Sequence, residues 1–373
     1  MQNAASSVNS RRRGISVPLN GRMLFACIFI CICLTWYSNI TLTTSNNFQQ
    51  DDSDFALELD SSTHSSKDKE CPNRIHLVVI SDRKKIDYPL KALVNSILNY
   101  TSTPITLNVV TSKNIDFLDE VNSNFFRVNY HDPALLLEKS RKAISETGFK
   151  SLHYSAHFAM QKLFINQLEF PHKDQVAKVL LLDDDFTFFV DMSPLWSIIA
   201  ANPKNISLYC PQDEERVLHY FTRKNAPNNG DTLRYCNSGI MGVPLDSKSQ
   251  SSNFTHYAIH AMRRMTREYD LSYAVADQDV VNRMYAEDKD NYELIPCRWG
   301  CDVNSCSGTA PNRGKCNTCL GQKCLAFHWL SKRYEQNNGN KWGQPRFNFL
   351  HYYQLNTTEL LNSVFIPRVQ EHC

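Results

Sequence analysis

Apolar and polar residues follow one another along the chain in blocks that predict strands and helices in turn. Continuous apolar runs at Ile75–Ser81, Ile105–Thr111 and Val179–Leu182 are typical of strands buried on both faces of a sheet. Between the first two, Tyr88–Asn99 places its large aliphatic residues on one helical face. Strand, helix and strand in close succession form a βαβ unit, so we expect an α/β fold with parallel strands.

Four later blocks extend this pattern. Ser155–Leu168 predicts a helix, and Ile206–Cys210 predicts a strand. The stretch Arg234–Leu245 is strand-like, and a polar Asn-Ser-Gly turn interrupts it, with a β-bulge as the alternative. Ala276–Tyr285 predicts a helix for which Asp277 is a candidate N-cap.

Three carboxylates, Asp183, Asp184 and Asp185, follow the strand Val179–Leu182 directly. Buried carboxylates cost free energy unless cations or donors compensate them, so we expect the triplet at the C-terminal end of the strand, where α/β sheets bind ligands. In an extended chain Asp183 and Asp185 point to one side and Asp184 to the other. Two carboxylates on one side suit Mg²⁺ or Mn²⁺ carrying a diphosphate, and a solvated acidic turn is the alternative.

One basic residue, Lys162, and one further acidic residue, Asp82, are expected close to this triplet in the predicted fold. Lys162 belongs to the helix before the acidic strand, from which its ammonium group could reach the carboxylates or remain solvated. Asp82 leaves the first strand where it could meet a nucleotide base or ribose, or serve as a plain turn residue.

Two further polar clusters are candidate ligand contacts. In the Asn-Ser-Gly segment, Gly239 permits close backbone approach to a ligand, and Asn237 could donate to a sugar hydroxyl or phosphate. Asp277, Gln278 and Asp279 lie at a helix start, where backbone N–H groups converge on a ligand or on a capping cluster.

A late histidine, His328, follows a short apolar run. It is either a core histidine or, as a neutral imidazole, the third ligand of a metal held by two aspartates. Lys332 and Arg333 lie just beyond it and could neutralise a diphosphate.

The N-terminus predicts a membrane anchor. Basic residues at 11–13 and Arg22 precede the apolar run Met23–Tyr37, which extended to Ile40 has about the minimum length of a spanning helix. Positive charge on the N-terminal side keeps that end cytosolic, and a cleaved signal peptide is the alternative. We therefore expect a cytosolic tail at 1–22, an anchor at 23–40, a polar stem at 41–71 and a folded luminal domain at 72–373.

Charge and cysteine content agree with a luminal domain. Lys plus Arg number 40 against 38 Asp plus Glu, which gives no reason to expect nucleic acid as a partner. Of the 13 cysteines, ten lie beyond the anchor, which allows five disulfides. Six of them fall between Cys297 and Cys324, where a disulfide-linked loop is favoured over zinc. N-x-S/T sequons occur at Asn39, Asn99, Asn205, Asn253 and Asn356.

The sequence contains, in this order, an apolar strand ending in D-x-D, the motif N-S-G, the motif D-Q-D-x-x-N and a late histidine followed by basic residues. In this order of motifs it resembles family 8 glycosyltransferases. The resemblance covers about Arg74 to Tyr353. It implies a GT-A fold, which is a Rossmann-like mixed sheet flanked by helices. We expect this fold in a single luminal domain with a disulfide-rich C-terminal insert, which is denser in cysteine than the family leads us to expect. The segments His153–Leu163, Tyr292–Trp299 and Phe327–Lys332 are similar to LARGE-type enzymes, whose family 8 domain transfers xylose, and somewhat less to glucoside xylosyltransferases.

The resemblance also implies roles for the candidate residues. Asp183, Asp185 and His328 would hold Mn²⁺, and Gln278, Asp277 and Asp279 would lie at the reacting sugar. The remaining expected donor contacts are Asp82, Lys162, Asp184, Asn237, Ser238, Gly239, Lys332 and Arg333. One departure concerns the glycine and lysine that usually follow the late histidine in this family, because Ser331 stands three residues after His328.

The expected function is that of a Golgi or endoplasmic-reticulum type II membrane enzyme. It would be a retaining glycosyltransferase that uses Mn²⁺ and moves a sugar, with xylose as the best guess, from a UDP-sugar to a glycan or glycoprotein acceptor. A catalytically inactive luminal sugar-binding or scaffolding protein on the same fold is one alternative. A zinc-stapled interaction module built on Cys297–Cys324 is the other.

Overall fold

The computed structural model describes residues 74–81, 87–151, 156–170, 176–201, 206–209, 236–245, 251–268, 276–302, 318–319, 322–329 and 351–372. All of these residues belong to the unit Asp68–Cys373. Within the described residues, no helix combines the length and apolar character needed to cross a membrane. The tail, anchor and stem expected at 1–71 lie outside the described residues and stay predictions.

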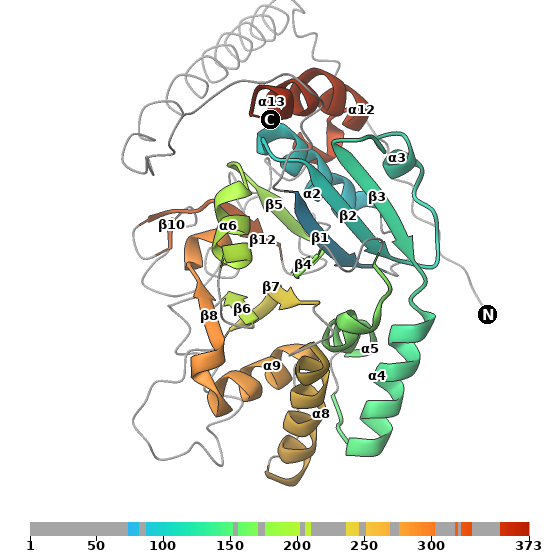
Figure 1. Ribbon diagram of the computed structural model, residues 1–373, viewed down its shortest axis with the longest axis vertical. Helices are drawn as coiled ribbons and strands as arrows, with labels where there is room; N and C mark the ends of the chain where they lie inside the picture. Colours follow the sequence, from blue (N-terminus) through green and yellow to red (C-terminus); the bar gives the residue numbers. More distant parts are fainter. Residues whose placement is uncertain are drawn as a thin grey trace, which may run out of the picture. The chain divides into compact units, whose positions relative to one another are not determined.

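A seven-stranded sheet with the order β3-β2-β1-β4-β7-β6-β8 forms the centre of the fold (Figure 1). Its strands are β1 (Ile75–Ile80), β2 (Ile105–Val110), β3 (Phe126–His131), β4 (Lys178–Leu182), β6 (Ile206–Tyr209), β7 (Asn237–Pro244) and β8 (Tyr292–Ile295). β1 pairs in parallel with β2, as the predicted βαβ unit requires, and on its other side it pairs in parallel with β4. β7 runs antiparallel to β4 and β6, so the sheet is mixed.

Side-chain alternation divides the core into one layer on each face of the sheet. On β4, Leu180 and Leu182 belong to one buried cluster, and Val179 and Leu181 belong to the other. A strand buried on both faces needs an apolar residue at every position, which explains the continuous apolar runs of the sequence.

Helices cover both faces. The element order also contains α2 (Asp87–Tyr100), α3 (Asp116–Asp119), α4 (Ala134–Thr147), α5 (Ala156–Ala159), α6 (Ser193–Ala201), α8 (Ser251–Glu268), α9 (Ala276–Glu287), α12 (Thr357–Leu360), a π-helix η8 (Leu361–Phe365) and α13 (Ile366–His372). Short 3₁₀ turns are η5 (Lys289–Asn291) and η6 (Cys297–Trp299). Residues of α2, α6, α12 and α13 belong to the core layer of Leu182, whereas residues of α4, α8 and α9 belong to the layer of Leu181.

Three local predictions need correction. The helix predicted at Ser155–Leu168 is α-helical only in α5 and continues as a 3₁₀-helix, η2 (Met160–Gln167). The Asn-Ser-Gly segment is the beginning of β7 and not a turn, although the pairing of β7 with β6 shifts register there, as a bulge would. Asp277 lies inside the first turn of α9 and is therefore not its N-cap.

A second sheet, β5-β12-β9, lies after the acidic triplet. It consists of β5 (Phe186–Phe188), β12 (Ala326–His328) and β9 (Cys301–Asp302), and a separate hairpin pairs β10 (Thr318–Cys319) with β11 (Gln322–Lys323). β12 pairs with β5 in antiparallel and with β9 in parallel orientation. Residues more than 100 positions apart in the sequence therefore meet beside the acidic strand.

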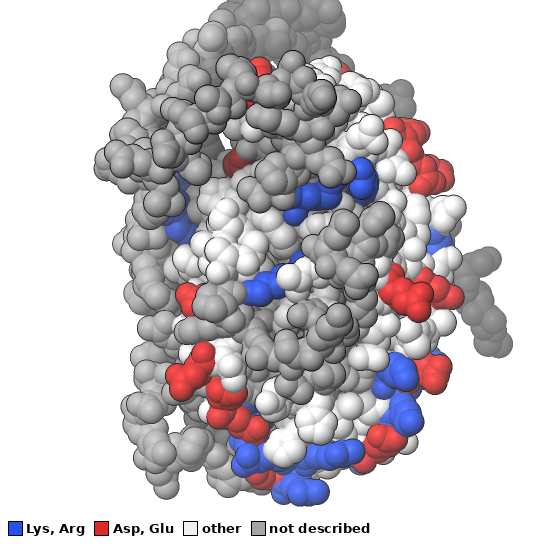
Figure 2. Space-filling view, in the orientation of Figure 1, with Lys and Arg blue, Asp and Glu red and all other residues white. Residues whose placement is uncertain are grey.

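Charged side chains connect α8 with α9, which carries the Asp-Gln-Asp motif. Arg283 contacts Glu268 at 2.8 Å and Glu287 at 2.6 Å, and Arg264 contacts Glu287 at 3.3 Å. Figure 2 shows basic and acidic side chains next to one another on this face of the molecule. Because single exposed ion pairs contribute little, we assign the network a supporting part in holding α9 on α8.

His76 on β1 is the described group with the clearest consequence for stability against pH. Burial, with a smaller effect of the Arg74 charge, lowers the pKa of His76 to about 4. Its ring lies 6.2 Å from the ring of Trp196 on α6. The folded protein therefore binds fewer protons here than the unfolded chain, and the stabilisation is complete above the unfolded pKa and is lost as pH falls from about 6.5 to about 4.

We predict that His76→Phe reduces the acid sensitivity of the fold, because phenylalanine keeps a ring beside Trp196 and has no titrating group. Denaturant unfolding at pH 7 and pH 4.5 would measure this. The wild type should lose roughly 1–2 kcal/mol more than the variant between the two pH values, a figure already reduced for the partial exposure of the ring. An equal loss in both proteins would contradict the prediction.

Candidate active site

The acidic triplet begins where β4 ends. Asp183 and Asp185 point toward His328, with Oδ2 of Asp183 at 3.6 Å and Oδ1 of Asp185 at 3.2 Å from its Nε2. Asp184 lies apart from them and accepts a hydrogen bond of 2.7 Å from the Ser81 hydroxyl at the end of β1. Asp183 and Asp185 therefore meet the late histidine and Asp184 points elsewhere, as predicted, although Asp184 and Asp185 lie in a turn and not in an extended strand.

Strand pairing brings His328 to this position. β12 pairs with β5 so that His328 lies opposite Phe186, the residue after the triplet, and their rings stack with centroids 4.3 Å apart. Next to it, the Trp329 amide donates to the Asp185 carbonyl at 2.9 Å, and the Trp329 indole donates to the Thr187 hydroxyl at 3.0 Å. Backbone and side-chain bonds together fix the histidine against the triplet.

Gly239 is needed because His328 lies directly against it. A Cβ atom at this position would lie 2.7 Å from Cε1 of His328, 2.8 Å from Oδ1 of Asn237 and 2.9 Å from Cε2 of Phe186. Its carbonyl accepts from the Asp183 amide at 2.9 Å, and its amide donates to Oδ1 of Asn237 at 2.7 Å. We predicted that Gly239 permits close approach of a ligand to the backbone. In the structure, the imidazole of His328 is the group that lies close to Gly239.

Lys162 is buried and not solvated. Its Nζ lies 2.6 Å from Oδ1 of Asp183 and 3.3 Å from Oδ2 of Asp277, and it donates to the Ser238 carbonyl at 3.1 Å. Burial opposes the charge of this ammonium, but the carboxylates of Asp183 and Asp277 outweigh burial and raise the pKa of Lys162 above its ordinary value. The lysine therefore remains a cation beside the acidic triplet.

The two carboxylates that share Lys162 differ in their proton affinity. Burial raises the pKa of Asp183, but Lys162 and His328 outweigh it, so the net pKa lies well below the ordinary value. The pKa of Asp277 is raised, mainly by burial and further by the Asp183 charge, although Lys162 and Ser238 act in the opposite direction. The shorter contact explains why Asp183 is the carboxylate that Lys162 holds ionised.

The beginning of α9 directs Asp277 toward Lys162. Ala276 has a φ of 45°, in the left-handed region that costs a non-glycine residue about 1–2 kcal/mol, and its amide donates to the Ser151 hydroxyl at 3.3 Å. Asp279 is buried, whereas Gln278 is partly exposed. Of the Asp-Gln-Asp motif, the structure thus places Asp277 at the cluster and leaves part of Gln278 accessible.

Asp183, Asp185 and His328 fit a divalent cation. One ligand atom from each lies within 4.8 Å of the others. Octahedral ligands at about 2.1 Å from an ion lie about 3 Å from their neighbours, which is close to the two histidine–carboxylate distances. Burial disfavours the imidazolium, but the Asp185 and Asp183 carboxylates raise the pKa of His328 to about 9. A proton on His328 balances the same negative charge that a cation would balance.

Three predicted donor contacts, Asp82, Lys332 and Arg333, lie outside the described residues. Two residues at the site had been given no role. Ser81 is the hydrogen-bond partner of Asp184. Its position at the end of β1 is the sequence feature that could have predicted its place at the site. Asn282 ends the D-Q-D-x-x-N pattern and binds the backbone of Cys236 through both of its side-chain polar atoms, a contact that no local pattern indicates.

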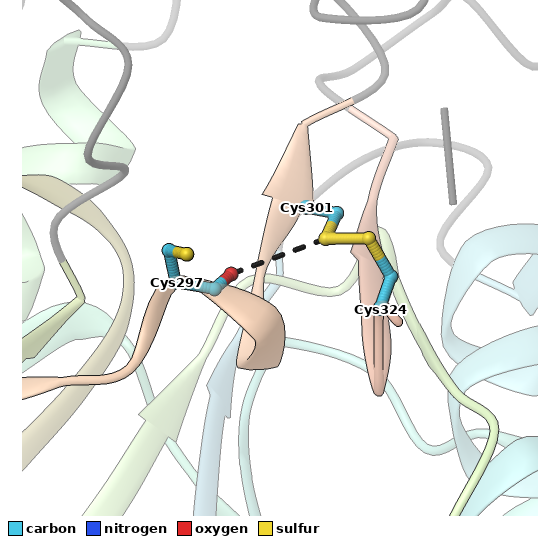
Figure 3. The surroundings of a disulfide bond; sticks show 3 residues. All are labelled: Cys297, Cys301 and Cys324. Carbon is cyan, nitrogen blue, oxygen red and sulfur yellow. Dashed lines mark hydrogen bonds between the residues drawn. A yellow bond between two sulfur atoms is a disulfide. The ribbon is translucent and has the colours of Figure 1, made fainter. Parts of the chain in front are cut away.

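A disulfide lies close to the strand that carries His328. Cys301 on β9 is bonded to Cys324, which precedes β12, with Cα atoms 6.0 Å apart (Figure 3). Cys236 and Cys297 are disulfide-bonded as well. The dashed contact in Figure 3 joins Sγ of Cys301 to the Cys297 carbonyl at 4.0 Å, and because a bonded sulfur has no proton we take it as a packing contact. Cys297, Cys301 and Cys324 are therefore not zinc ligands, so these three of the six cysteines in Cys297–Cys324 do not fit the zinc-module alternative.

Solved structures with the same fold are glycosyltransferases. Mouse xyloside xylosyltransferase 1 aligns over 69% of this chain and 98% of its own, with a TM-score of 0.52 and 14% identity. The galactosyltransferase LgtC, solved with donor and acceptor sugar analogues, aligns over 75% of this chain and 95% of its own, with a TM-score of 0.53 and 14% identity. The architecture is thus the GT-A glycosyltransferase fold, as expected.

The sequence comparison then specifies the family. The model of "Glycosyl transferase family 8" matches residues 40–318, more than half of the chain, so the protein belongs to that family. It is 24% identical over 240 residues to human xylosyl- and glucuronyltransferase LARGE2, covering 62% of this chain and 31% of that protein. Mouse glucoside xylosyltransferase 1 is 21% identical over 246 residues, covering 62% of this chain and 57% of that protein. The match thus spans less than two thirds of either relative.

We predict that Gly239→Ala displaces His328, because the added methyl group meets buried ring atoms at less than 3 Å. The substitution should cost about 1–3 kcal/mol of unfolding free energy and weaken Mn²⁺ binding at least about tenfold. Thermal unfolding and Mn²⁺ titration would measure the two effects.

Gly148→Ala is the matched control. Gly148 ends α4 with a φ of 68°, so alanine there is strained, although its Cβ would approach only Cγ2 of Thr266 at 3.5 Å. This variant should lose stability without losing Mn²⁺ affinity. Equal Mn²⁺ affinity in both variants would contradict the role assigned to Gly239.

Proposed function

We propose that this chain is a retaining, Mn²⁺-dependent glycosyltransferase that moves a sugar from a UDP-sugar to a glycan or glycoprotein acceptor. The observation that carries the proposal is the cluster of Asp183, Asp185 and His328 beside the Lys162–Asp277 ion pair, in a family 8 chain with a GT-A fold. An inactive sugar-binding protein would not need this set of ligands, so the set favours an enzyme over that alternative.

Each residue has a defined part in this proposal. Asp183, Asp185 and His328 would hold the cation, which when bound supplies positive charge for the diphosphate of the departing UDP. Lys162 keeps Asp183 ionised through the oxygen that does not face His328. The buried Asp277 would orient the sugar, together with Asp279, Asn237 and the backbone of β7.

Gln278 is the partly exposed residue of the Asp-Gln-Asp motif, and an amide is a poor nucleophile. We therefore favour attack by the acceptor hydroxyl on the face from which UDP departs. The bond from the anomeric carbon to the phosphate oxygen breaks, the bond to the acceptor oxygen forms, and the acceptor proton goes to the leaving phosphate. Gln278 would polarise or position the sugar between them.

Xylose is our proposed donor sugar, and a luminal, membrane-anchored setting is the proposed location. The relatives named xylosyltransferases support the first, because LARGE2 and glucoside xylosyltransferase 1 match this chain by sequence. Disulfide bonding of Cys236, Cys297, Cys301 and Cys324 supports the second, because such bonds persist in oxidising compartments.

A panel of UDP-sugars offered to the purified protein with mixed glycan acceptors, with and without Mn²⁺, would test the reaction. Product mass should show a pentose increment that depends on Mn²⁺. A hexose increment as the main product would overturn xylose and keep the glycosyltransferase. Failure to bind UDP or release it with any divalent metal would overturn the enzyme proposal.

Asp185→Asn and Asp184→Asn form an isosteric pair that tests the metal site. We predict that Asp185→Asn weakens Mn²⁺ binding at least about tenfold, because it removes a charged ligand that faces His328. Asp184→Asn should stay within about threefold of the wild type, since its amide oxygen can still accept from Ser81. Calorimetric titration would measure both, and equal losses would refute the geometry assigned to the triplet.

A further inference from the structure

Asn282 binds two separate segments of the candidate site through one buried amide. Its Oδ1 accepts from the Cys236 amide at 2.6 Å, and its Nδ2 donates to the Cys236 carbonyl at 2.7 Å and to the Gln278 carbonyl at 2.7 Å. The side chain is 7% exposed. Because two partners are carbonyls and one is an N–H, only one orientation of the amide satisfies all three bonds.

The Cys236 end of this contact lies directly before β7, where β7 pairs with β6 through Asn237 and Tyr209 but not yet with β4. Pairing of β7 with β4 begins at Ile240, and pairing with β6 shifts register between Asn237 and Met241. The Asn282 amide meets both backbone groups of Cys236 in the way a neighbouring strand would. Among the residues that follow, Ser238 accepts a hydrogen bond from Lys162, and Gly239 accepts one from the Asp183 amide and lies against His328.

The other end of the contact lies one helical turn earlier on α9, at Gln278. Gln278 follows Asp277, the partner of Lys162. One neutral side chain thus fixes the distance between the start of β7 and the start of α9. Within the described part of the chain, its side chain bonds to backbone groups of Cys236 and Gln278, so it does not belong to the metal cluster.

We propose that Asn282 is a positioning residue that sets the spacing between the Asn-Ser-Gly strand and the Asp-Gln-Asp helix, and thereby the pocket for the donor sugar, without taking part in metal binding. The expected effect of Asn282 on transfer kinetics rests on the proposed function. Its expected structural effect, protection of the Cys236 backbone amide from hydrogen exchange, does not depend on any ligand.

The test compares Asn282→Ala, Asn282→Asp and Asn282→Leu in the full chain. Alanine removes all three bonds, and leucine removes them while keeping the volume. Aspartate keeps an acceptor for the Cys236 amide but turns an oxygen toward two carbonyls. All three variants should lower kcat/KM about tenfold to a hundredfold, with UDP-xylose or whichever UDP-sugar the wild type turns over. The Kd for UDP with Mn²⁺ should stay within about twofold, because the metal ligands lie on other elements.

Hydrogen–deuterium exchange supplies the readout that needs no activity. Peptides containing Cys236–Gly239 should exchange faster in all three variants, whereas peptides containing β2, which β1 and β4 separate from β7 in the sheet, should not change. Asn95→Ala is the matched control. Asn95 is also fully buried and donates to two backbone carbonyls, those of Tyr352 and Leu355, so its loss should lower thermal stability and leave kcat/KM unchanged.

Each outcome has a defined meaning. If Asn282→Asp and Asn282→Leu keep wild-type kcat/KM and wild-type exchange, Asn282 only fills space and the proposal is wrong. A parallel loss of UDP binding and transfer in the variants would also overturn it, because that result indicates general misfolding. A wild type that neither binds nor hydrolyses any UDP-sugar would overturn the proposed function, and the exchange at Cys236 would still decide the positioning of β7.

Discussion

The free energy of buried charge is the constraint on which this site depends. Asp185 and Asp277 have almost no exposed side-chain surface, and Asp183 is only partly exposed. Carboxylates in such surroundings are costly unless cations lie against them, and removing one partner of a buried pair costs about 3–5 kcal/mol. Lys162 and His328 are those partners, and Asp183 touches both. The surrounding elements are arranged so that two cationic side chains from distant parts of the sequence reach one strand end.

The two elements that deliver Lys162 and His328 are held in different ways. η2 brings Lys162 from the layer of the core that also contains α9, so the ion pair with Asp277 joins two elements of one face. β12 brings His328 through a small sheet whose edge is fixed by the Cys301–Cys324 bond. That bond closes a loop of 23 residues, and closing such a loop removes disorder from the unfolded chain. The histidine strand is thereby tied to β9 independently of its pairing with the acidic segment.

Local patterns were sufficient for the parts of the fold that depend on local chemistry. The continuous apolar run of β4 predicted the buried strand, and helical periodicity predicted α2. The alternation of successive side chains predicted that Asp184 points away from Asp183 and Asp185. The predictions were wrong where packing against a neighbouring element determines the local conformation. The 3₁₀ winding of η2 buries residues in succession from Met160 to Asn166, and the Asn-Ser-Gly segment belongs to a strand whose first residue, Asn237, pairs with Tyr209 of β6. Nothing near Gly239 in the sequence indicates that an imidazole from residue 328 will lie against it.

The side chains that form the charged cluster and the groups that position them differ in net charge, and this difference has a physical reason. Lys162, Asp183, Asp185 and His328 carry or accept charge, whereas Ser81, Asn282, Gly239 and the backbone of β7 are neutral. A charged residue used for positioning at this distance would shift the pKa values of its neighbours, since one charge within 4–6 Å moves a carboxyl pKa by about 1–3 units. A neutral hydroxyl or amide fixes geometry without changing the net charge that a diphosphate would meet. The three bonds of Asn282 supply rigidity in this way, and leave the electrostatic balance to the ion pairs alone.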